Sequence, residues 1–491
     1  MIASLACRFR FRQFLAACRD PLTAQAARLR CMLRQASGTV IGRQHGFNRL
    51  SRLSDSAMIR GYQARIPIRS YRDMSADLEA VYHGDWSRLC PSPPLYFSMT
   101  AGSTGAFKYL PVTAESRREV SQGSMIFNGA LEAAFPGLRH LKSQFLVGSA
   151  EGGQSPTGLA QGFSSGLNYK HLPWLVRRKF AVPYWIFTID DANERNYAAG
   201  RVLVAERRLG ALCAISPVNL INLRQALEQN PGRLIDDVRS GQLMVRGRST
   251  VAGTYRTRPD PVRSERLRRA WEATGSFPSR VLFPALQVLV SWQGGNMSYY
   301  LDELQQAFGL DQRFEFPISA SEGLFAIPCE PNQAGGALAI TSHFLEFLPD
   351  LGGWTSGAPA LRADQLSPGS QYRIVLTTGA GLYRYDMEDI VRVRGYCAAT
   401  PIIEFVSKAD RQVSVANERL TELDVTVAAT AASAVSGFHP SEFLFVPCRD
   451  RKYRVVVDGL ALGPEVSRHV VDLQGFEDEL ERQLRSTAKG V

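Results

Sequence analysis

Short runs rich in β-branched and aromatic residues alternate with longer segments of helical periodicity along most of this chain. Apolar residues recur at helical spacing over 218–229 and 301–308, whereas 372–377 and 402–405 are apolar runs of strand length. Because this alternation is typical of α/β proteins, we predict an α/β fold. The 491 residues contain no internal repeat and suffice for one large domain with a small one, or for three ordinary domains.

The clearest domain boundary is a charged, polar stretch at 407–417. It follows a predicted strand and precedes a segment with strands of its own and a final helix over 476–485. We therefore predict a large domain over 1–405 and a small α+β domain over 406–491.

The start of the chain predicts an amphipathic helix. Asp20 and Pro21 form a common helix start, an aspartate cap followed by proline, and apolar residues then recur at helical spacing as far as Gly38. A basic amphipathic helix can bind a membrane surface, but packing of its apolar face on the main body is the favoured interpretation.

Composition excludes several classes of protein. Hydrophobic residues make up 45% and charged residues 21%, the balance of a soluble globular chain rather than a disordered one. The strongest apolar run, 281–290, contains Pro284 and Gln287 and is too short for a membrane span, so we predict a core strand there. Arginines interrupt the apolar residues of 1–21, which predicts no signal peptide and a cytoplasmic location.

The net charge of +11 suggests nucleic-acid binding, but the distribution of the charge argues against it. Only seven of the 57 basic residues are lysines, and the arginines are spread over the whole length rather than gathered in one stripe. The eight cysteines lie far apart without a C-x-x-C pair, which predicts reduced thiols rather than a metal centre. We therefore expect neither a nucleic acid nor a membrane as partner.

A loop rich in glycine and hydroxyl residues follows a predicted strand at 94–97. It reads Ser-Met-Thr-Ala-Gly-Ser-Thr-Gly-Ala-Phe-Lys over 98–108. Backbone N–H groups and hydroxyls of such a loop can surround a phosphate, and Lys108 can add a positive charge. The loop lacks the Gly-Lys-Ser/Thr ending of a Walker motif, and an ordinary turn is the alternative interpretation.

Two carboxylates further along the chain stand beside glycine-containing turns. Glu322 lies in Ser-Ala-Ser-Glu-Gly over 319–323, where a single carboxylate suits Mg²⁺ bridging to nucleotide phosphates; a surface turn is the alternative. Asp389 follows a Gly-Ala-Gly-Leu-Tyr-Arg-Tyr stretch at 379–385 and is predicted at the start of a strand. There it could accept hydrogen bonds from both ribose hydroxyls, unless it forms a structural ion pair with an arginine.

The order of these three motifs resembles the adenylate-forming enzymes, most closely the Gretchen Hagen (auxin-responsive) family of acyl acid-amido synthetases. The resemblance runs from about residue 42 to about residue 422. Its other landmarks are Arg65-Ile-Pro-Ile-Arg-Ser-Tyr-Arg-Asp73, Trp292-Gln-Gly-Gly295, Phe344-Leu-Glu-Phe347 and Asn417-Glu-Arg-Leu-Thr-Glu422. It implies a large N-terminal lobe with mixed β-sheets flanked by helices, and a small C-terminal lobe that rotates between two reaction steps.

The resemblance also implies the chemistry. A carboxylate attacks the α-phosphate of ATP to give an acyl-adenylate and pyrophosphate, and an amine, usually of an amino acid, then attacks the acyl carbon to form an amide. Lys108 would offset phosphate charge, Glu322 would bind Mg²⁺, Asp389 would bind the ribose, and Lys408 would be the basic residue of the hinge. The other implied ATP-binding positions are Thr100, Ala101, Gly102, Ser103, Thr104, Gly105, Ser321 and Tyr385.

The acid pocket is implied between the main sheet and the helices that precede the second motif. Its candidate residues are Phe163, Trp185, Ser216, Val218 and Trp292, for which ordinary core packing is the alternative. None of the seven histidines is a convincing general base. His343 lies closest to a motif, and a structural role is favoured for it.

Several positions depart from the family pattern. Ile318 stands where an aromatic residue usually packs on adenine, Glu388 replaces a glycine, Ala101 replaces a serine, and Arg419 replaces a lysine. A late lysine of the family has no clear counterpart, because Lys489 lies at the very end of the sequence.

We predict an ATP- and Mg²⁺-dependent acid–amine ligase of specialised metabolism that acts on a small carboxylic acid and an amine as a monomer or weak homodimer. One alternative keeps the adenylate chemistry but uses a thiol, hydroxyl or hydrazine-like acceptor. The other is a catalytically degraded relative that serves as a binding partner.

Overall fold

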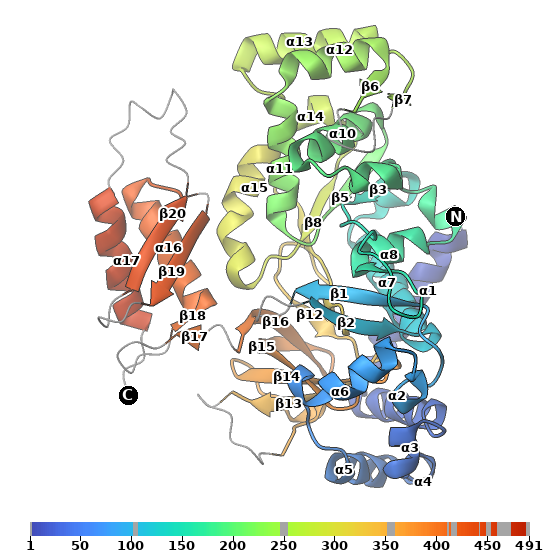
Figure 1. Cartoon of the computed structure of the whole chain (residues 1–491). Helices are drawn as coiled ribbons and strands as arrows, with labels where there is room; N and C mark the ends of the chain where they lie inside the picture. The colour runs from blue at the N-terminus through green and yellow to red at the C-terminus, as the bar shows by residue number, and fades with distance from the viewer. Residues whose placement is uncertain are drawn as a thin grey trace.

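Two central sheets organise the main body of the protein, which we describe from a computed structural model (Figure 1). The structure describes residues 2–101, 107–245, 254–350, 359–409, 412–413, 420–440, 442–447, 453–458 and 473–487. In these ranges one sheet has seven antiparallel strands, a second has four parallel strands, and a third has three. The predicted α/β class and the mixed sheets flanked by helices are confirmed.

In the seven-stranded and three-stranded sheets, the order of the strands differs from their order along the chain. The seven-stranded sheet contains, from one edge to the other, β10 (Ile318–Ala320), β11 (Gly323–Ile327), β12 (Gly336–Leu338), β16 (Thr400–Lys408), β15 (Tyr385–Cys397), β14 (Gln371–Thr377) and β13 (Phe344–Pro349). The three-stranded sheet contains β2 (Phe107–Val112), β1 (Tyr96–Ala101) and β4 (Gln161–Phe163). The parallel sheet keeps the chain order, with β3 (Lys142–Phe145), β5 (Leu209–Cys213), β8 (Val288–Ser291) and β9 (Arg313–Glu315).

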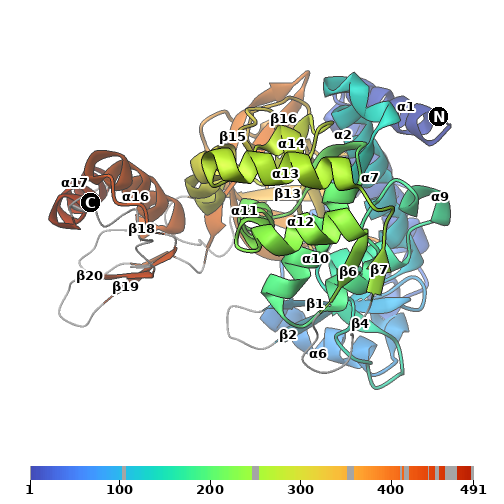
Figure 2. The ribbon, with the colours of Figure 1, turned by 90° about the horizontal axis from the view of Figure 1, so that it is seen from above.

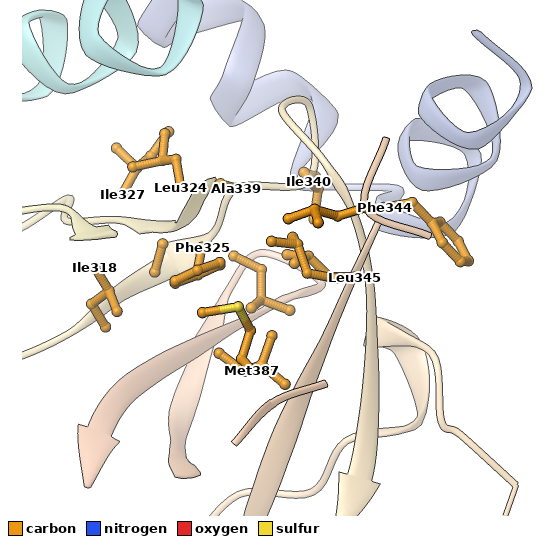
Figure 3. Packing of buried hydrophobic residues seen from close by; sticks show 14 of the residues in the cluster. Ile318, Leu324, Phe325, Ile327, Ala339, Ile340, Phe344, Leu345 and Met387 are labelled. Carbon is orange, nitrogen blue, oxygen red and sulfur yellow. The ribbon is translucent and has the colours of Figure 1, made fainter. Parts of the chain in front are cut away.

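The first hydrophobic core lies between the N-terminal helices and the seven-stranded sheet; Figure 3 shows part of it around Leu324, Phe325 and Met387. The predicted helix start is confirmed, since the Asp20 side chain accepts a hydrogen bond from the backbone N–H of Thr23. The N-terminal helices are α1 (Ile2–Ala17), α2 (Pro21–Gln35), α3 (Val40–Gln44), α4 (Phe47–Leu50), α5 (Asp55–Arg65), α6 (Tyr71–Tyr82) and α7 (Ala114–Ala134).

The second hydrophobic core packs on one face of the parallel sheet, with Leu212 and Leu289, whereas Cys213 and Val288 on the other face belong to the first core. Every residue of β5 and β8 is buried. Strands buried on both faces read as continuous apolar runs, as these do. The covering helices are α8 (Ser164–Lys170), α9 (Trp174–Arg177), α10 (Ala192–Ala205), α11 (Pro217–Glu228), α12 (Pro231–Ser240), α13 (Pro261–Thr274), α14 (Ser279–Leu282) and α15 (Leu301–Phe308). The short elements are η1 (Trp86–Arg88), η2 (Pro136–His140), η3 (Tyr184–Thr188), η4 (Gly295–Tyr300), η5 (Ala363–Gln365), β6 (Gln242–Met244) and β7 (Thr254–Arg256).

The prediction of one strand over 281–290 is wrong for most of its length. Residues 281 and 282 end α14, and β8 begins only at Val288. Pro284 explains the difference, because it has no N–H to donate and its ring prevents the helix from continuing past Phe283.

The C-terminal segment forms a small unit beside the main body, as Figures 1 and 2 show from two directions. It has its own apolar cluster, which includes Ala432, Phe438 and Phe476. Its elements are β17 (Gln412–Val413), β18 (Leu420–Thr421), α16 (Glu422–Ser436), β19 (Glu442–Pro447), β20 (Tyr453–Asp458) and α17 (Leu473–Thr487). Within the described ranges, no helix has both the length and the apolar character to cross a lipid bilayer.

Candidate active site

The phosphate-loop motif forms the hairpin of β1 and β2. Thr100 and Lys108 lie opposite each other in its register, just below the tip. The tip itself, with Gly102, Ser103, Thr104 and Gly105, lies outside the described residues, as does the side chain of Ala101.

Lys108, near the tip of this hairpin, is held by an aromatic ring. Its Nζ lies 4.7 Å from the centroid of the Tyr71 ring, a cation–π contact. Tyr71 occupies this place because it is the first residue of α6, which begins with a capping box between Ser70 and Asp73. The lysine ammonium is therefore fixed close to the glycine-rich tip.

The second motif is the two-residue turn of Ser321 and Glu322 between β10 and β11. Three serine hydroxyls connect it to the hairpin. Ser164 Oγ donates to Ser321 Oγ at 3.1 Å and also forms a hydrogen bond with Ser98 Oγ of β1. We call Ser98, Ser164 and Ser321 the serine chain; it brings the first and second motifs to one place.

Tyr385 joins the third motif to the second. Its hydroxyl, at the start of β15, donates to Glu322 Oε1 at 3.5 Å. Burial raises the pKa of Tyr385, and the charge of Glu322 adds to this, so the phenol keeps its proton. Burial likewise raises the pKa of Tyr71, with a smaller part from Glu322. The Glu322 carboxylate is thus within electrostatic reach of Tyr385 in the third motif and of Tyr71, the ring that contacts Lys108.

Asp389 pairs with Lys408. The two residues face each other across β15 and β16, where Lys408 Nζ forms an ion pair with Asp389 Oδ1 and lies 3.4 Å from the Met387 carbonyl. Asp389 is only 6% exposed, and burial raises its pKa to about 6 although Lys408 opposes the shift. This pair places the predicted ribose ligand and the predicted hinge lysine in direct contact.

The prediction that Asp389 lies at the start of a strand is wrong. Strand β15 already begins at Tyr385, which pairs with Leu376 of β14. The alternative prediction was an ion pair between Asp389 and an arginine. An arginine ion pair forms nearby, but it joins Arg373 to Asp386, whereas Asp389 pairs with Lys408.

Glu388, which replaces a glycine of the family pattern, has a backbone conformation that favours glycine. Its φ is +57°, in the left-handed region, where a side chain costs about 1–2 kcal/mol and glycine costs little. Two hydrogen bonds hold this conformation, from Glu388 N–H to Asp386 Oδ1 at 2.9 Å and from Ala409 N–H to the Glu388 carbonyl at 2.7 Å. The glutamate is therefore accommodated without displacing Asp389 from the strand.

Three of the five acid-pocket candidates gather at the carboxyl ends of the parallel strands, where α/β sheets usually bind ligands. Ser216 follows β5 and caps α11 by accepting from Val218 N–H at 3.2 Å. Trp292 follows β8, and its indole Nε1 donates to the Pro317 carbonyl at 3.2 Å, beside buried Ile318.

The other two candidates lie elsewhere. Phe163 ends β4, is 47% exposed and pairs with Met99 of the phosphate hairpin. Trp185 lies in η3 and packs on the second hydrophobic core, so the alternative of core packing fits it best.

The residues that sequence reasoning missed are Tyr71, Ser98 and Ser164. Tyr71 had a usable signal, since it lies in a family landmark, and Ser98 opens the first motif. Ser164 had none, because only the fold brings the start of α8 to the turn at Ser321.

The donor set fits a magnesium ion held mainly by phosphates. No cluster of three or more histidine, cysteine, aspartate or glutamate side chains suited to a metal occurs among the described residues. Glu322 lies on a turn as a half-buried carboxylate, and Mg²⁺ bound to nucleotides typically takes one or two carboxylates together with phosphate oxygens and water. The cysteines of the described ranges carry free thiols, as predicted.

Comparisons with known proteins agree with the geometry. The model of the GH3 family N-terminal domain matches residues 10–312, and that of the GH3 family central domain matches residues 336–408. Among curated relatives, the indole-3-acetic acid-amido synthetase GH3.8 of Oryza sativa subsp. indica is 26% identical over 432 residues, covering 81% of this chain and 69% of its own. The indole-3-acetic acid-amido synthetase GH3.4 of Arabidopsis thaliana is 23% identical, covering 81% and 70%.

Solved structures share the fold. The AtGH3.15 acyl acid amido synthetase in complex with 2,4-DB superposes with a TM-score of 0.78 at 17% identity, covering 98% of this chain and 85% of the other. The 2-hydroxyisobutyryl-CoA ligase in its postadenylation state gives a TM-score of 0.57 at 11% identity, covering 94% and 83%. The predicted resemblance is confirmed, and the chain belongs to the GH3 family, with the fold of the adenylate-forming enzymes.

Proposed function

We propose that this chain is an ATP-dependent acyl acid amido synthetase that activates a carboxylic acid as its acyl-adenylate and transfers the acyl group to an amine. The observation that carries the proposal is the convergence of three distant motifs. The serine chain joins the phosphate hairpin to the Glu322 turn, and Tyr385 joins that turn to the strand of Asp389. The acid–amide chemistry is also the activity named for the relatives GH3.8 and GH3.4.

The residues support the first step by binding and by charge. Lys108, fixed over Tyr71, would contact the phosphates that leave as pyrophosphate. Glu322 would hold Mg²⁺, which offsets the negative charge that otherwise repels the attacking carboxylate. Asp389 would accept hydrogen bonds from the ribose hydroxyls once Lys408 turns away from it. Catalysis of this step is mainly the alignment of two anions.

We also propose that residues 406–491 form a unit that swivels between the two steps. Its own apolar cluster supports this division. Hydrogen bonds link it to η4, from Asn296 Nδ2 to Glu422 Oε1 at 2.7 Å and from the Tyr299 hydroxyl to the Pro440 carbonyl at 2.7 Å. Lys408 is the last residue of β16 and lies at the start of this unit, as a hinge residue would.

The experiment is pyrophosphate release from ATP and Mg²⁺ over a panel of aryl, indolyl, fatty and other small carboxylic acids, with and without a mixture of amino acids. Release that depends on one acid, with an amide of that acid found by mass spectrometry, would support the proposal. Lys108→Ala should abolish the release, and Tyr197→Phe, which removes a hydrogen bond to Asp237 in the second core, is a matched control that should retain it. Wild-type protein that releases no pyrophosphate with any acid would contradict the proposal.

A further inference from the structure

A buried histidine lies directly behind the Glu322 turn. His343 is 0% exposed, and its Nε2 accepts a hydrogen bond from the backbone N–H of Leu324 at 3.0 Å. A neutral imidazole that accepts at Nε2 carries its proton on Nδ1. That Nδ1 atom lies 3.1 Å from Oε2 of Glu119 on α7. The ring therefore accepts a hydrogen bond from the first residues of β11 and lies against a carboxylate of helix α7, to which its Nδ1 makes a close contact but no hydrogen bond.

Glu119 is itself 4% exposed and connects to a second segment of the site. Its Oε2 accepts from the backbone N–H of Gly379 at 3.1 Å, and its Oε1 accepts from Arg28 Nη2 at 2.7 Å. Arg28 thus supplies the countercharge that a buried carboxylate requires. Gly379 opens the loop that leads to Tyr385.

His343 and Glu119 each contact a different segment of the site. One segment carries Glu322 and the other carries Tyr385, and these two side chains contact each other. Leu324 follows the Glu322 turn, and Gly379 precedes the strand of Tyr385, whose hydroxyl donates to Glu322. The packing leaves no free space, because a Cβ at Gly323 would come within 2.7 Å of His343 Nε2. A side chain at Gly323 would therefore push the turn away from the histidine.

We propose that His343 and Glu119 are positioning residues for adenylation, which fix the Glu322 turn and the Tyr385 strand relative to each other from beneath. Neither side chain reaches solvent, so both act through the backbone of the groups that bind substrate. The consequence for activity rests on the proposed function, whereas the consequence for the backbone does not.

Two substitutions separate the two contacts of the ring. His343→Gln can keep an acceptor at the place of Nε2, whereas His343→Asn can keep a donor at the place of Nδ1 but leaves the Leu324 N–H without an acceptor. We expect His343→Asn to lower the kcat of acid-dependent pyrophosphate release about tenfold or more, with little change in the KM for the acid. His343→Gln should stay within about threefold of wild type.

Hydrogen–deuterium exchange gives a readout that does not depend on activity. The amide exchange rate of the peptide over 318–327 should rise in His343→Asn and stay near the wild-type rate in His343→Gln. We expect both variants to have the Tm of the wild type. Tyr197→Phe, which removes the hydrogen bond to Asp237 elsewhere in the molecule, should leave this peptide unchanged. Equal exchange at 318–327 in wild type and His343→Asn would overturn the inference, as would equal losses of kcat in both histidine variants. Inactive wild-type protein would refute the proposed function, while the exchange ranking would still decide the positioning role.

Discussion

The two carboxylates of the candidate site stand in opposite surroundings. Glu322 occupies a two-residue turn, is half-buried, and receives one long hydrogen bond from Tyr385. Asp389 lies within a central strand, is almost fully buried, and is paired with Lys408. The turn therefore offers a carboxylate to an incoming cation, whereas the strand keeps its carboxylate neutralised until something replaces the lysine. This difference predicts that Glu322 governs activity and Asp389 governs the response to pH.

The largest effect is expected from Glu322→Gln, which removes the negative charge but keeps the shape of the side chain. We expect pyrophosphate release to fall about 10²–10³-fold, the usual loss when one electrostatic partner of a transition state is removed. The Tm should change little, because the residue is half-exposed on a turn. Activity within threefold of wild type would show that the turn is not the cation site.

Asp389→Asn tests the buried member of the comparison. The folded-state pKa of about 6 lies above the unfolded value near 3.8, so between these values the folded state binds a proton that the unfolded state does not. The wild-type free energy of unfolding should therefore fall by about 3 kcal/mol as the pH rises from about 4 to about 6. The free energy of unfolding of Asp389→Asn should not show this decrease when it is measured by urea denaturation over the same pH range. Parallel slopes for the two proteins would contradict the assignment.

Lys408→Met removes the partner while leaving Asp389 in place. At pH 8 the buried carboxylate would lose its ion pair, and we expect a loss of about 1 kcal/mol, a modest value because the lysine side chain is 40% exposed. At pH 5 the carboxyl is protonated and the loss should shrink. A loss that is the same at both pH values would show that the lysine acts by packing alone.

The smallest effect is expected from Tyr385→Phe, which deletes only the hydroxyl that reaches Glu322. At 3.5 Å this hydrogen bond is long, so we expect pyrophosphate release to fall no more than about fivefold. A fall as large as that of Glu322→Gln would mean that the tyrosine itself contacts substrate, which would sharpen the division between the two carboxylates.

Local patterns predicted most of what lies within one segment. The cap at Asp20 depends on neighbouring residues and is confirmed. The strand predicted at 94–97 before the phosphate motif is present as β1, two residues further along the chain. The position of Asp389 was missed because the start of β15 depends on pairing with β14, a partner that the local pattern does not contain.

The contacts between segments could not be predicted. Ser164 and Glu119 have ordinary sequence surroundings, whereas His343 stands next to a family landmark and only a structural role is predicted for it. Each acquires its position in the site from a segment more than a hundred residues away. The acid-pocket candidates show the same limit. The carboxyl ends of β5 and β8 bring Ser216 and Trp292 to one edge of the sheet, while Trp185, a tryptophan like Trp292, packs on the second hydrophobic core.

The serine chain has a property that ion pairs lack. Each hydroxyl can donate or accept, so the hydrogen bonds among Ser98, Ser164 and Ser321 can run in either direction without moving a heavy atom. In the proposed reaction the site meets a triphosphate first and an acyl-adenylate afterwards, two ligands that differ in charge. Rotating three O–H bonds would let the protein reverse the polarity of this link between the phosphate hairpin and the Glu322 turn while the backbone stays still.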